Sequence, residues 1–398
     1  MTTPPADDLP YPPGPLGDPP CEYARLRSEA PLTRVRLPTG HEVWLATRYE
    51  DVVTVTSDTR FARDDRYLFM RIPADDAAQD GDGGEQDRRS QARLRLRQVV
   101  QDALRPRHAQ AWQGRVRQLV RTCLDDLEAA GAPADLVRQY AFAVPVSVVC
   151  ELLGVPDRDR DLFHQWANIR LSVTAYSKDE VAEAHHAYEE YVGDLIARRR
   201  RAPGEGLLDA MIRVKDTDEG LTEYDLRRMV RGLITAGHQA STNMIARGVL
   251  LLLRHPGQLD RLRADPGLIG GAVEEILRYN MPGDTGVPRV AYEDVALTTG
   301  TVRRGEVVLA PPVSANRDEG RFRDADRFDI GRSDNAHLSF GHGAHYCLGA
   351  SLARIELRTA IGMLVERFPG LALATDPERL RWSDGLLVRQ LEELPVTW

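Results

Sequence analysis

Apolar and polar positions along the chain predict a short β portion near the start and a long helical portion after it. Residues 32–37 and 42–47 each alternate apolar and polar side chains, and a Pro-Thr-Gly turn separates them. That pattern is typical of a β-hairpin. Residues 48–57 are expected to form a short helix, and residues 108–215 several amphipathic helices broken at turns that contain glycine and proline.

The longest predicted helix comes next. Residues 222–225, Thr-Glu-Tyr-Asp, have the form of a capping box and open a helical pattern, so residues 222–253 are predicted to be one central helix. Shorter helices are expected over residues 256–265 and 268–279. A helical pattern starts again at Ala350.

A long loop is predicted over residues 61–91, which contain the run Gly81-Asp82-Gly83-Gly84. Loops of this length are usually disordered or functional. From residue 92 to residue 104 the apolar side chains return at helical spacing, which places Arg93 and Arg97 four residues apart on one helix face. Taken alone, this pair indicates a solvated basic stripe.

Composition and charge exclude several classes of protein. The chain has 398 residues, of which 42% are hydrophobic and 28% charged, as in ordinary globular proteins. A formal net charge of −8 argues against nucleic-acid binding. The proline-rich segment 1–20 lacks the basic start and apolar run of a signal peptide or membrane anchor, so we expect a cytoplasmic protein without membrane attachment.

The cysteines and arginines further limit the classes of binding site that the chain could have. The four cysteines are widely spaced and form no C-x-x-C pair, which argues against a disulfide framework or a zinc site; they are Cys21, Cys123, Cys150 and Cys347. Arginines cluster at residues 93–97, 105–107 and 198–201. Such clusters are either solvated faces or docking surfaces for an acidic partner.

The most informative stretch is residues 340–349, Phe-Gly-His-Gly-Ala-His-Tyr-Cys-Leu-Gly, which places three glycines around Cys347. Glycines there allow unusual backbone angles and let main-chain N–H groups approach the sulfur. A helix beginning just after the cysteine would favour the thiolate. Glycines and a cysteine alone are equally typical of a turn with a buried structural cysteine, but this arrangement also suits a metal-bound thiolate.

The complete string matches F-G-x-G-x-H-x-C-x-G and resembles the cysteine loop of the cytochrome P450 family. The resemblance covers nearly the whole chain. It implies a mainly α fold with a small β portion, built as a single compact domain (1–398) around a buried heme b, iron protoporphyrin IX. Cys347 would be the axial thiolate of the iron, with Phe340 and Gly349 also in the heme-binding loop.

The resemblance also implies which residues hold the heme and the frame around it. Heme propionates would bind Arg93, where the family has histidine, together with Arg97, Arg289 and His345. Glu275 and Arg278 match the family's structural ion pair, and Arg327 is expected to be its third member. In isolation, an E-x-x-R sequence is a common surface pair.

Substrate-pocket residues are predicted in three places by the same resemblance. The loop 61–91 would cover the pocket, with Phe69 and Met70 in its wall. Val287 would line the pocket from a strand over residues 287–291, and a turn over 383–388 would present Leu386 or Leu387. The alternatives are a surface loop with a buried aromatic anchor and, for the leucines, ordinary core positions.

The central helix departs from the family pattern A-G-x-[DE]-T, in which glycine lets the helix lie near the heme and an acid and an alcohol deliver protons to dioxygen. This chain has Ala236-Gly237-His238-Gln239-Ala240-Ser241-Thr242. Gln239 takes the place of the acid and Ala240 that of the alcohol. An amide releases no proton near neutral pH, and a methyl group forms no hydrogen bond.

Protons must then come from another source. Ordered water, His238, Ser241, Thr242 or a polar group of the substrate could each supply them. Ser241 and Thr242 are turned by about 100° and 200° from position 240 on a helix, so substrate or water is favoured. A histidine on a helix is usually a packing residue.

These residues predict a cytochrome P450 oxidoreductase that uses dioxygen, a small-molecule substrate, and electrons from a separate ferredoxin and ferredoxin reductase. Loss of the acid and alcohol favours oxidative coupling or substrate-assisted oxidation of an aromatic natural product, a peptide or polyketide of secondary metabolism. Ordinary C–H hydroxylation by a monooxygenase is the alternative. A heme-binding sensor or recruiting module without turnover is a further one.

Overall fold

The computed structural model describes residues 7–38, 40–62, 94–160, 162–163, 166, 169, 175–283, 286, 288–386 and 388–398. The chain divides into two compact units, each assembled from three separate segments. Unit 1 comprises Met1–Ala78, Arg254–Cys347 and Leu387–Gln390, and unit 2 comprises Gln79–Leu253, Leu348–Leu386 and Leu391–Trp398. The single-domain organisation stays a prediction.

Unit 1 contains a six-stranded sheet in the order β1-β2-β3-β9-β6-β4. The predicted hairpin is confirmed, because β2 and β3 pair antiparallel with Leu32 opposite Ala46. Strand β9 adds parallel to β3 and antiparallel to β6. The strand bounds are β1 (Asp7–Asp8), β2 (Leu32–Arg36), β3 (Glu42–Ala46), β4 (Phe61–Ala62), β6 (Arg289–Ala291) and β9 (Val307–Leu309); β7 (Val295–Leu297) and β8 (Gly300–Val302) form a separate hairpin.

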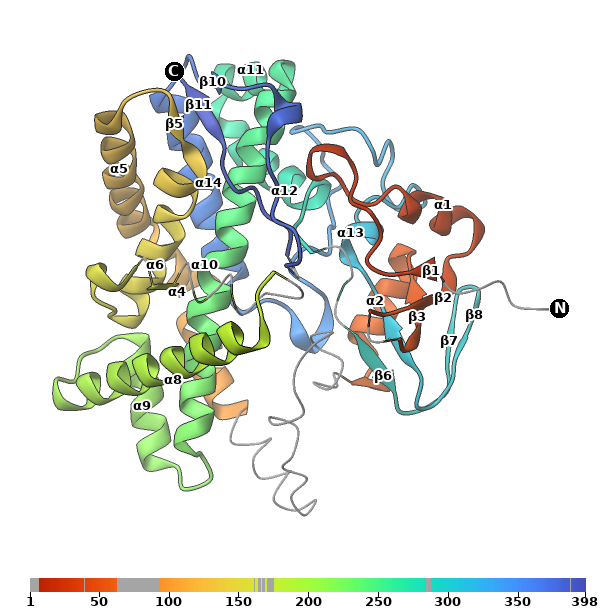
Figure 1. Cartoon of the computed structure of the whole chain (residues 1–398), viewed down its shortest axis with the longest axis horizontal. Coiled ribbons are helices and arrows are strands. Elements are labelled where there is room, and N and C mark those ends of the chain that lie inside the picture. The colour runs from red at the N-terminus through yellow and green to blue at the C-terminus, as the bar shows by residue number, and fades with distance from the viewer. Residues whose placement is uncertain are drawn as a thin grey trace. The chain divides into compact units, whose positions relative to one another are not determined.

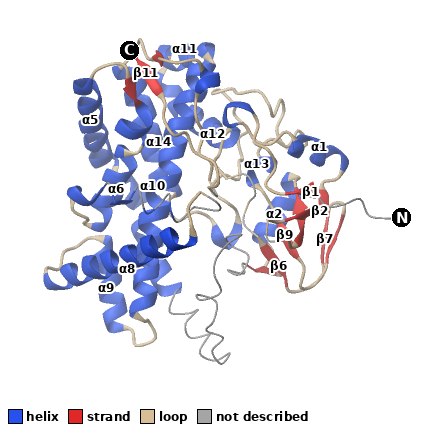
Figure 2. Ribbon diagram, viewed as in Figure 1, coloured by secondary structure: helices blue, strands red, loops and turns tan. Residues whose placement is uncertain are grey.

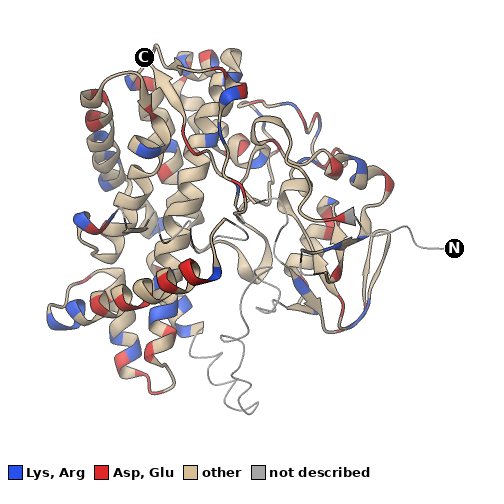
Figure 3. Ribbon diagram, in the orientation of Figure 1, with Lys and Arg blue, Asp and Glu red and all other residues tan. Residues whose placement is uncertain are grey.

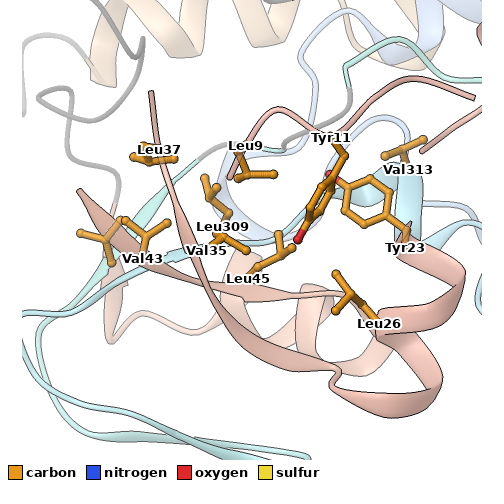
Figure 4. Close-up of a cluster of buried hydrophobic side chains, with 11 residues drawn as sticks. Leu9, Tyr11, Tyr23, Leu26, Val35, Leu37, Val43, Leu45, Leu309 and Val313 are labelled. Atoms are coloured by element: carbon orange, nitrogen blue, oxygen red, sulfur yellow. The ribbon is translucent and has the colours of Figure 1, made fainter. Parts of the chain in front are cut away.

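Both faces of this sheet are covered by hydrophobic clusters. Alternate side chains of a strand point to opposite faces, so neighbouring residues of β3 can belong to different clusters. Val43 and Leu45 of β3 belong to one hydrophobic cluster, which also contains residues of α1 (Figure 4). Ala46 of β3 and Val308 of β9 join a second cluster, which residues of α2 complete. The helices of unit 1 are α1 (Glu22–Glu29), α2 (Tyr49–Ser57), α11 (Pro256–Ala264), α12 (Ile269–Tyr279) and α13 (Pro312–Ala315), with 3-10 turns η1 (Pro15–Gly17), η6 (Pro266–Leu268) and η7 (Gly343–His345).

Unit 2 is mainly helical, as Figure 2 shows. Its helices are α4 (Pro106–Ala111), α5 (Gln113–Ala130), α6 (Ala143–Leu153), α8 (Lys178–Arg201), α9 (Leu207–Thr217), α10 (Glu223–Arg254, which ends at the first residue of the next unit 1 segment) and α14 (Ala350–Arg367). Residues 94–103 are also helical. A small antiparallel sheet has the order β10 (Ala372–Leu373), β11 (Pro395–Thr397) and β5 (Ala134–Asp135), and short turns are η4 (Val137–Ala141), η5 (Asp157–Asp159) and η8 (Pro377–Arg379).

Local sequence explains where these helices begin, end and pack. In α5 the buried residues follow the helical period; they are Val116, Leu119, Val120, Cys123, Leu124 and Leu127. Helix α6 ends at Gly154, which adopts left-handed angles that L side chains avoid. The predicted capping box is confirmed at α10, where Asp225 N–H donates to Thr222 Oγ1 at 3.2 Å and Thr222 N–H donates to Asp225 Oδ2 at 3.1 Å.

Helix α10 is the core element of unit 2 (Figure 1). Every residue from 241 to 250 is buried, and the stretch between Arg231 and Arg247 carries no Lys, Arg, Asp or Glu. Figure 3 shows this stretch without charge, whereas α8 carries many acidic and basic residues. Among the described residues, no helix is long and apolar enough to span a membrane.

Candidate active site

The cysteine loop of unit 1 is held by its own main chain. Cys347 N–H donates to the Phe340 carbonyl at 2.9 Å, and Tyr346 N–H donates to the Gly343 carbonyl at 3.0 Å. Gly341 and Gly343 have φ of 73° and 71°, in the left-handed region that favours glycine. The loop therefore needs glycine at both positions for its backbone path.

Gly343 is required for a second reason. A Cβ at this position would lie 2.7 Å from Ser57 Cα and 2.8 Å from Thr56 O, both in the main chain of α2. Backbone atoms cannot swing away as a side-chain end can, so only glycine permits this contact. The loop is thus seated directly on the last turn of α2.

The start of the loop is tied to α12 and α13. Leu338 N–H donates to Asn316 Oδ1 at 2.7 Å, and Asn316 Nδ2 donates to Ser339 Oγ at 2.9 Å. Ser339 Oγ in turn donates to the carbonyl of Leu277 at 2.6 Å. Sequence reasoning missed Asn316 and Ser339, because no motif marks them.

The predicted ion pair is part of the same frame. Arg278 Nε and Nη2 each donate to a different Glu275 oxygen at 2.8 Å, and both side chains are completely buried. Arg278 Nη1 also donates to the carbonyl of Asn316 at 2.8 Å. A buried bidentate pair with additional hydrogen bonds is geometrically strict, so it fixes Asn316 and, through it, the entry to the cysteine loop.

The prediction that Arg327 is the third member of the ion pair was wrong. Arg332, not Arg327, pairs with Glu275, through Nε and Oε2 at 3.1 Å. Arg327 contributes only its carbonyl, which accepts from Arg278 Nη2 at 3.3 Å and from Arg332 Nη2 at 3.1 Å. The sequence places both arginines on the same connecting segment, and only the path of its backbone decides which side chain reaches Glu275.

The outer side of the loop is open. Residues 342–347 are all exposed, including Cys347, and the Tyr346 side chain is 45% exposed. All four cysteines lie within the described residues and are thiols. A firmly held loop that presents a thiol and an aromatic ring fits the thiolate side of a heme, because the glycines let a flat group approach the backbone.

The predicted propionate ligands are found in different settings. Arg289 in β6 is buried, and its Nη1 donates to the carbonyl of Pro288 at 3.1 Å. His345 is exposed in η7, and Arg97 is half-buried in the helix over residues 94–103. Arg93 lies outside the described residues. A buried guanidinium such as that of Arg289 suits an anionic heme edge, and its role as a propionate ligand stays a prediction.

The centre of α10 shows what its glycine does in this chain. A Cβ at Gly237 would lie 2.7 Å from Val149 Cγ2 of α6, so glycine permits close packing of α6 on α10. The His238 ring is buried, with Nδ1 2.7 Å from the carbonyl oxygen of Ile234, and it lies at 83° to the Phe142 ring at a centroid distance of 5.9 Å. His238 therefore has the contacts of a packing residue.

The neighbouring positions differ in exposure. Gln239 is buried, and its main-chain carbonyl accepts a hydrogen bond from Asn243 Nδ2 at 3.1 Å. Ala236 and Ala240, one helical turn apart, are exposed, although residues 238, 239 and 241–250 are buried. This uncharged, small-residue face is the part of α10 on which a flat group and a substrate could lie.

Most predicted substrate-pocket residues lie outside the described residues, namely Phe69, Met70, Val287 and Leu387. Leu386 is half-buried in unit 2. It follows Gly385, which has φ of 69° and accepts from Ala175 N–H at 3.3 Å. A turn is therefore present where the sequence predicted one, and its role in a pocket stays a prediction.

The arginine cluster at the end of α8 is matched by acids of unit 2. Arg199 pairs with Asp209, and Arg200 pairs with Asp216 at 2.7 Å and Glu223 at 2.9 Å. These ion pairs join α8 to α9 and to the start of α10. Arg199 and Arg200 of the cluster therefore form ion pairs that hold helices of unit 2 together.

Comparisons with known proteins agree with this geometry. The sequence profile described as Cytochrome P450 matches residues 268–392. Mycinamicin IV hydroxylase/epoxidase of Micromonospora griseorubida is 42% identical over 377 residues, 94% of each chain. Nocardicin C N-oxygenase of Nocardia uniformis subsp. tsuyamanensis is 43% identical over 392 residues, 96% of this chain and 98% of that one.

A solved structure extends the agreement to the whole fold. The putative thioether synthase SgvP, described as involved in the tailoring step of griseoviridin, superposes with a TM-score of 0.90 at 37% identity, covering 99% of this chain and 100% of that chain. The chain belongs to the cytochrome P450 family. It is a heme-dependent monooxygenase of the bacterial type, and the residues of the cysteine loop fit that cofactor.

Proposed function

We propose that this cytochrome P450 oxidises an aromatic natural product of secondary metabolism, a peptide or polyketide, by oxidative coupling or by an oxidation in which the substrate assists proton delivery. The observation that carries the proposal is the pair Gln239-Ala240 at the positions of the family's acid and alcohol. Without them, the reaction that depends most on controlled proton delivery, insertion of oxygen into a C–H bond, loses its usual support.

That the substrate is a natural product of secondary metabolism rests on the relatives. Their names refer to mycinamicin IV and nocardicin C, and the similar structure is described as acting in the tailoring of griseoviridin. Each is a secondary metabolite that an oxidase modifies. One of these enzymes is described as a putative thioether synthase, which supports bond formation as a reaction type within this group.

Bound heme would supply a thiolate-ligated iron that activates dioxygen. The chain's own residues would do the rest. Cys347 would hold the iron on a loop that the glycines and Asn316 keep in place. The amide of Gln239 can donate a hydrogen bond but releases no proton, and the methyl of Ala240 leaves an exposed face that water or a polar substrate group can occupy.

Ordinary C–H hydroxylation is the second candidate. It is favoured by the name of the 42% identical relative, a hydroxylase/epoxidase. A water held at the exposed face of Ala240 would then have to replace the missing alcohol. Oxygen labelling separates the two candidates.

Turnover under labelled dioxygen, with the product analysed by mass spectrometry, tests the reaction type. A product that has lost hydrogen and carries no label supports coupling. A product that has gained one labelled oxygen atom contradicts coupling and identifies the enzyme as one that inserts oxygen. Candidate aromatic peptides and polyketides should first be ranked by the spectral change they cause on binding.

The double substitution Gln239→Glu and Ala240→Thr tests the proton argument. Restoring the acid and alcohol should change the oxidation rate and the share of electrons lost as hydrogen peroxide. Position 240 is exposed, so threonine there should fit without steric cost. Unchanged rate and peroxide release would show that residues 239 and 240 have no part in proton delivery.

The redox partners and cellular location complete the proposal. A separate ferredoxin and ferredoxin reductase would supply electrons, with the protein acting in the cytoplasm. NADPH consumption with a surrogate ferredoxin pair, measured with and without candidate substrates, tests this assignment. Substrate-dependent consumption supports it, and consumption that requires no ferredoxin contradicts it.

A further inference from the structure

A continuous row of hydrogen bonds in unit 1 leads from the main chain of Cys347 toward a carboxylate of α12. Cys347 N–H donates to the Phe340 carbonyl at 2.9 Å. The N–H of Gly341 belongs to the same peptide group as that carbonyl, and it donates to the Leu338 carbonyl at 2.8 Å. Two peptide groups of the cysteine loop are thus linked end to end.

A histidine continues the row to the carboxylate. Ser339 N–H, in the same peptide group as the Leu338 carbonyl, donates to His337 Nδ1 at 3.2 Å. His337 Nε2 lies 3.1 Å from Glu274 Oε2 of α12. The side chain of His337 is 2% exposed and that of Glu274 22% exposed, so water and salt screen this contact little.

The two contacts of His337 determine where its ring hydrogen lies. A main-chain N–H can only donate, so Nδ1 accepts from Ser339 and carries no hydrogen. The ring hydrogen is therefore on Nε2, from which the Glu274 carboxylate accepts it. A carboxylate that accepts from a histidine in this way fixes the orientation of the ring and makes its other nitrogen more basic.

All links of the row have the same direction. Each N–H donates away from Cys347, so each peptide group has its negative oxygen end toward the cysteine and its positive N–H end toward Glu274. Hydrogen bonds in such a row polarise one another, by roughly 10–30% per bond. A negative charge at the positive end adds to this polarisation, as an acid does at the N-terminus of a helix. Glu274 therefore makes the surroundings of the Cys347 amide more negative.

Histidine is more than the local turn requires at position 337. Asn and Asp side chains commonly accept from the main-chain N–H two residues later, which is the contact that His337 Nδ1 makes with Ser339. A second polar atom at the far end of the side chain is needed only to reach Glu274. The local contact and the link to the carboxylate can therefore be separated by substitution.

We propose that Glu274 and His337 are positioning residues that act through this row on Cys347, keep its sulfur electron-rich and so lower the reduction potential of the heme iron. The proposal rests on Cys347 as the heme ligand and is independent of the type of reaction. Hydrogen bonds and charges around a ligating sulfur tune the reduction potential, because reduction adds an electron to surroundings that are already negative. The row acts by charge and orientation alone, so no proton is transferred along it.

Reduction potentials of the substrate-free holoprotein test this link. Glu274→Gln keeps an acceptor for the histidine and removes the charge, whereas His337→Asn keeps the charge and removes the link. Each should favour the reduced iron by roughly threefold, which raises the potential by about 30 mV for a one-electron couple. Carbon monoxide on the reduced iron should show a higher stretching frequency in both variants, because a less electron-rich thiolate passes less electron density to it.

A double-mutant cycle separates the row from an effect of charge through space. If the row transmits the charge, Glu274→Gln should have little further effect in a chain that already carries His337→Asn. If Glu274→Gln shifts the potential equally in both backgrounds and His337→Asn alone shifts nothing, the proposal is overturned.

Glu274→Asp is the matched control, because the shorter side chain keeps the charge and withdraws it from the histidine. Its potential should rise as in Glu274→Gln. This variant also decides the matter should His337→Asn fail to retain heme, since a potential equal to that of the wild-type protein would contradict transmission through the row.

Heme ligation is checked in the same proteins. The red-shifted Soret band of the reduced carbon monoxide complex should be present in the wild-type protein and in every variant. Its absence from the wild-type protein would remove Cys347 as the ligand, and the proposal with it. A normal band with unchanged potentials would remove only the role of Glu274 and His337. Neither result depends on the reaction type that oxygen labelling finds.

Discussion

The cysteine loop of unit 1 and the centre of α10 in unit 2 are held in opposite ways. The loop depends on special backbone angles at Gly341 and Gly343 and on main-chain contact with α2. The centre of α10 is regular helix whose backbone bonds form whatever the side chains are. Gly237 is a position there at which an added Cβ would come too close to a neighbour, 2.7 Å from Val149 Cγ2.

This difference explains why one motif is complete and the other altered. In the loop, a change of residue type changes the path of the backbone and so the position of the thiol. At positions 239 and 240 of α10, a change of side chain alters chemistry and leaves the fold intact. Catalytic variation within one fold is therefore expected in the helix, and strict residue identity is expected in the loop.

Cys347→Ala should have the largest effect. The dithionite-reduced holoprotein exposed to carbon monoxide should lose the red-shifted Soret band of a thiolate-ligated heme, and turnover should fall to background, because alanine provides no ligand. Cys21→Ala removes another exposed thiol and should leave the band intact. Persistence of the band in Cys347→Ala would refute the assignment of the ligand.

Gly343→Ala should destabilise the protein by about 3 kcal/mol, because strain at positive φ adds to overpacking against α2. Gly341→Ala has similar φ, but the added methyl would make only an ordinary contact, 3.8 Å from His345 O, so its cost should be only about 1 kcal/mol. Urea unfolding of both holoproteins, with heme content per chain, measures the difference. Equal costs would show that contact with α2 does not hold the loop.

Arg332→Ala should lower the free energy of unfolding by about 2 kcal/mol, since Glu275 loses a charged hydrogen-bond partner while buried. Arg327→Ala should cost no more than about 0.5 kcal/mol, because the Arg327 side chain is exposed and only its carbonyl bonds to the ion-pair residues. Chemical denaturation of the two variants and the wild-type protein measures these free energies of unfolding. The reverse order would restore Arg327 as the third member of the ion pair.

Gly237→Ala should have a smaller effect than Arg332→Ala, a loss of about 1 kcal/mol, because the clash with Val149 is partly offset by the better helix propensity of alanine. Val149→Ala in the same chain should relieve the clash, so the two substitutions should be energetically coupled. A double-mutant cycle in urea measures the coupling. Additive losses would mean that α6 and α10 do not meet at this glycine.

Elements with a strong local pattern were predicted well. The β2-β3 hairpin, α10 with its capping box, and helices α11 and α12 lie where periodicity and capping placed them. Of the three glycines of the cysteine loop, Gly341 and Gly343 adopt the left-handed angles expected from the motif, whereas Gly349 has φ of −87° and does not. Each of these features depends on neighbouring residues, whose propensities and hydrogen bonds are readable along the chain.

Residues that meet across the fold could not be predicted. Arg332 reaches Glu275 from a segment where Arg327 had matched the pattern equally well. Asn316 and Ser339 support the cysteine loop without any motif, and Glu356 meets Ser241 from another helix. No local pattern records such pairs.

The amino-acid order alone decided the class of protein, the thiolate candidate and the loss of an acid and an alcohol from α10, because these depend on residue identity and short spacing. The tertiary structure decided which arginine completes the buried ion pair, why Gly237 is a glycine and where a buried acid lies. The physical reason is that burial and hydrogen bonding between distant segments exist only once the helices have packed.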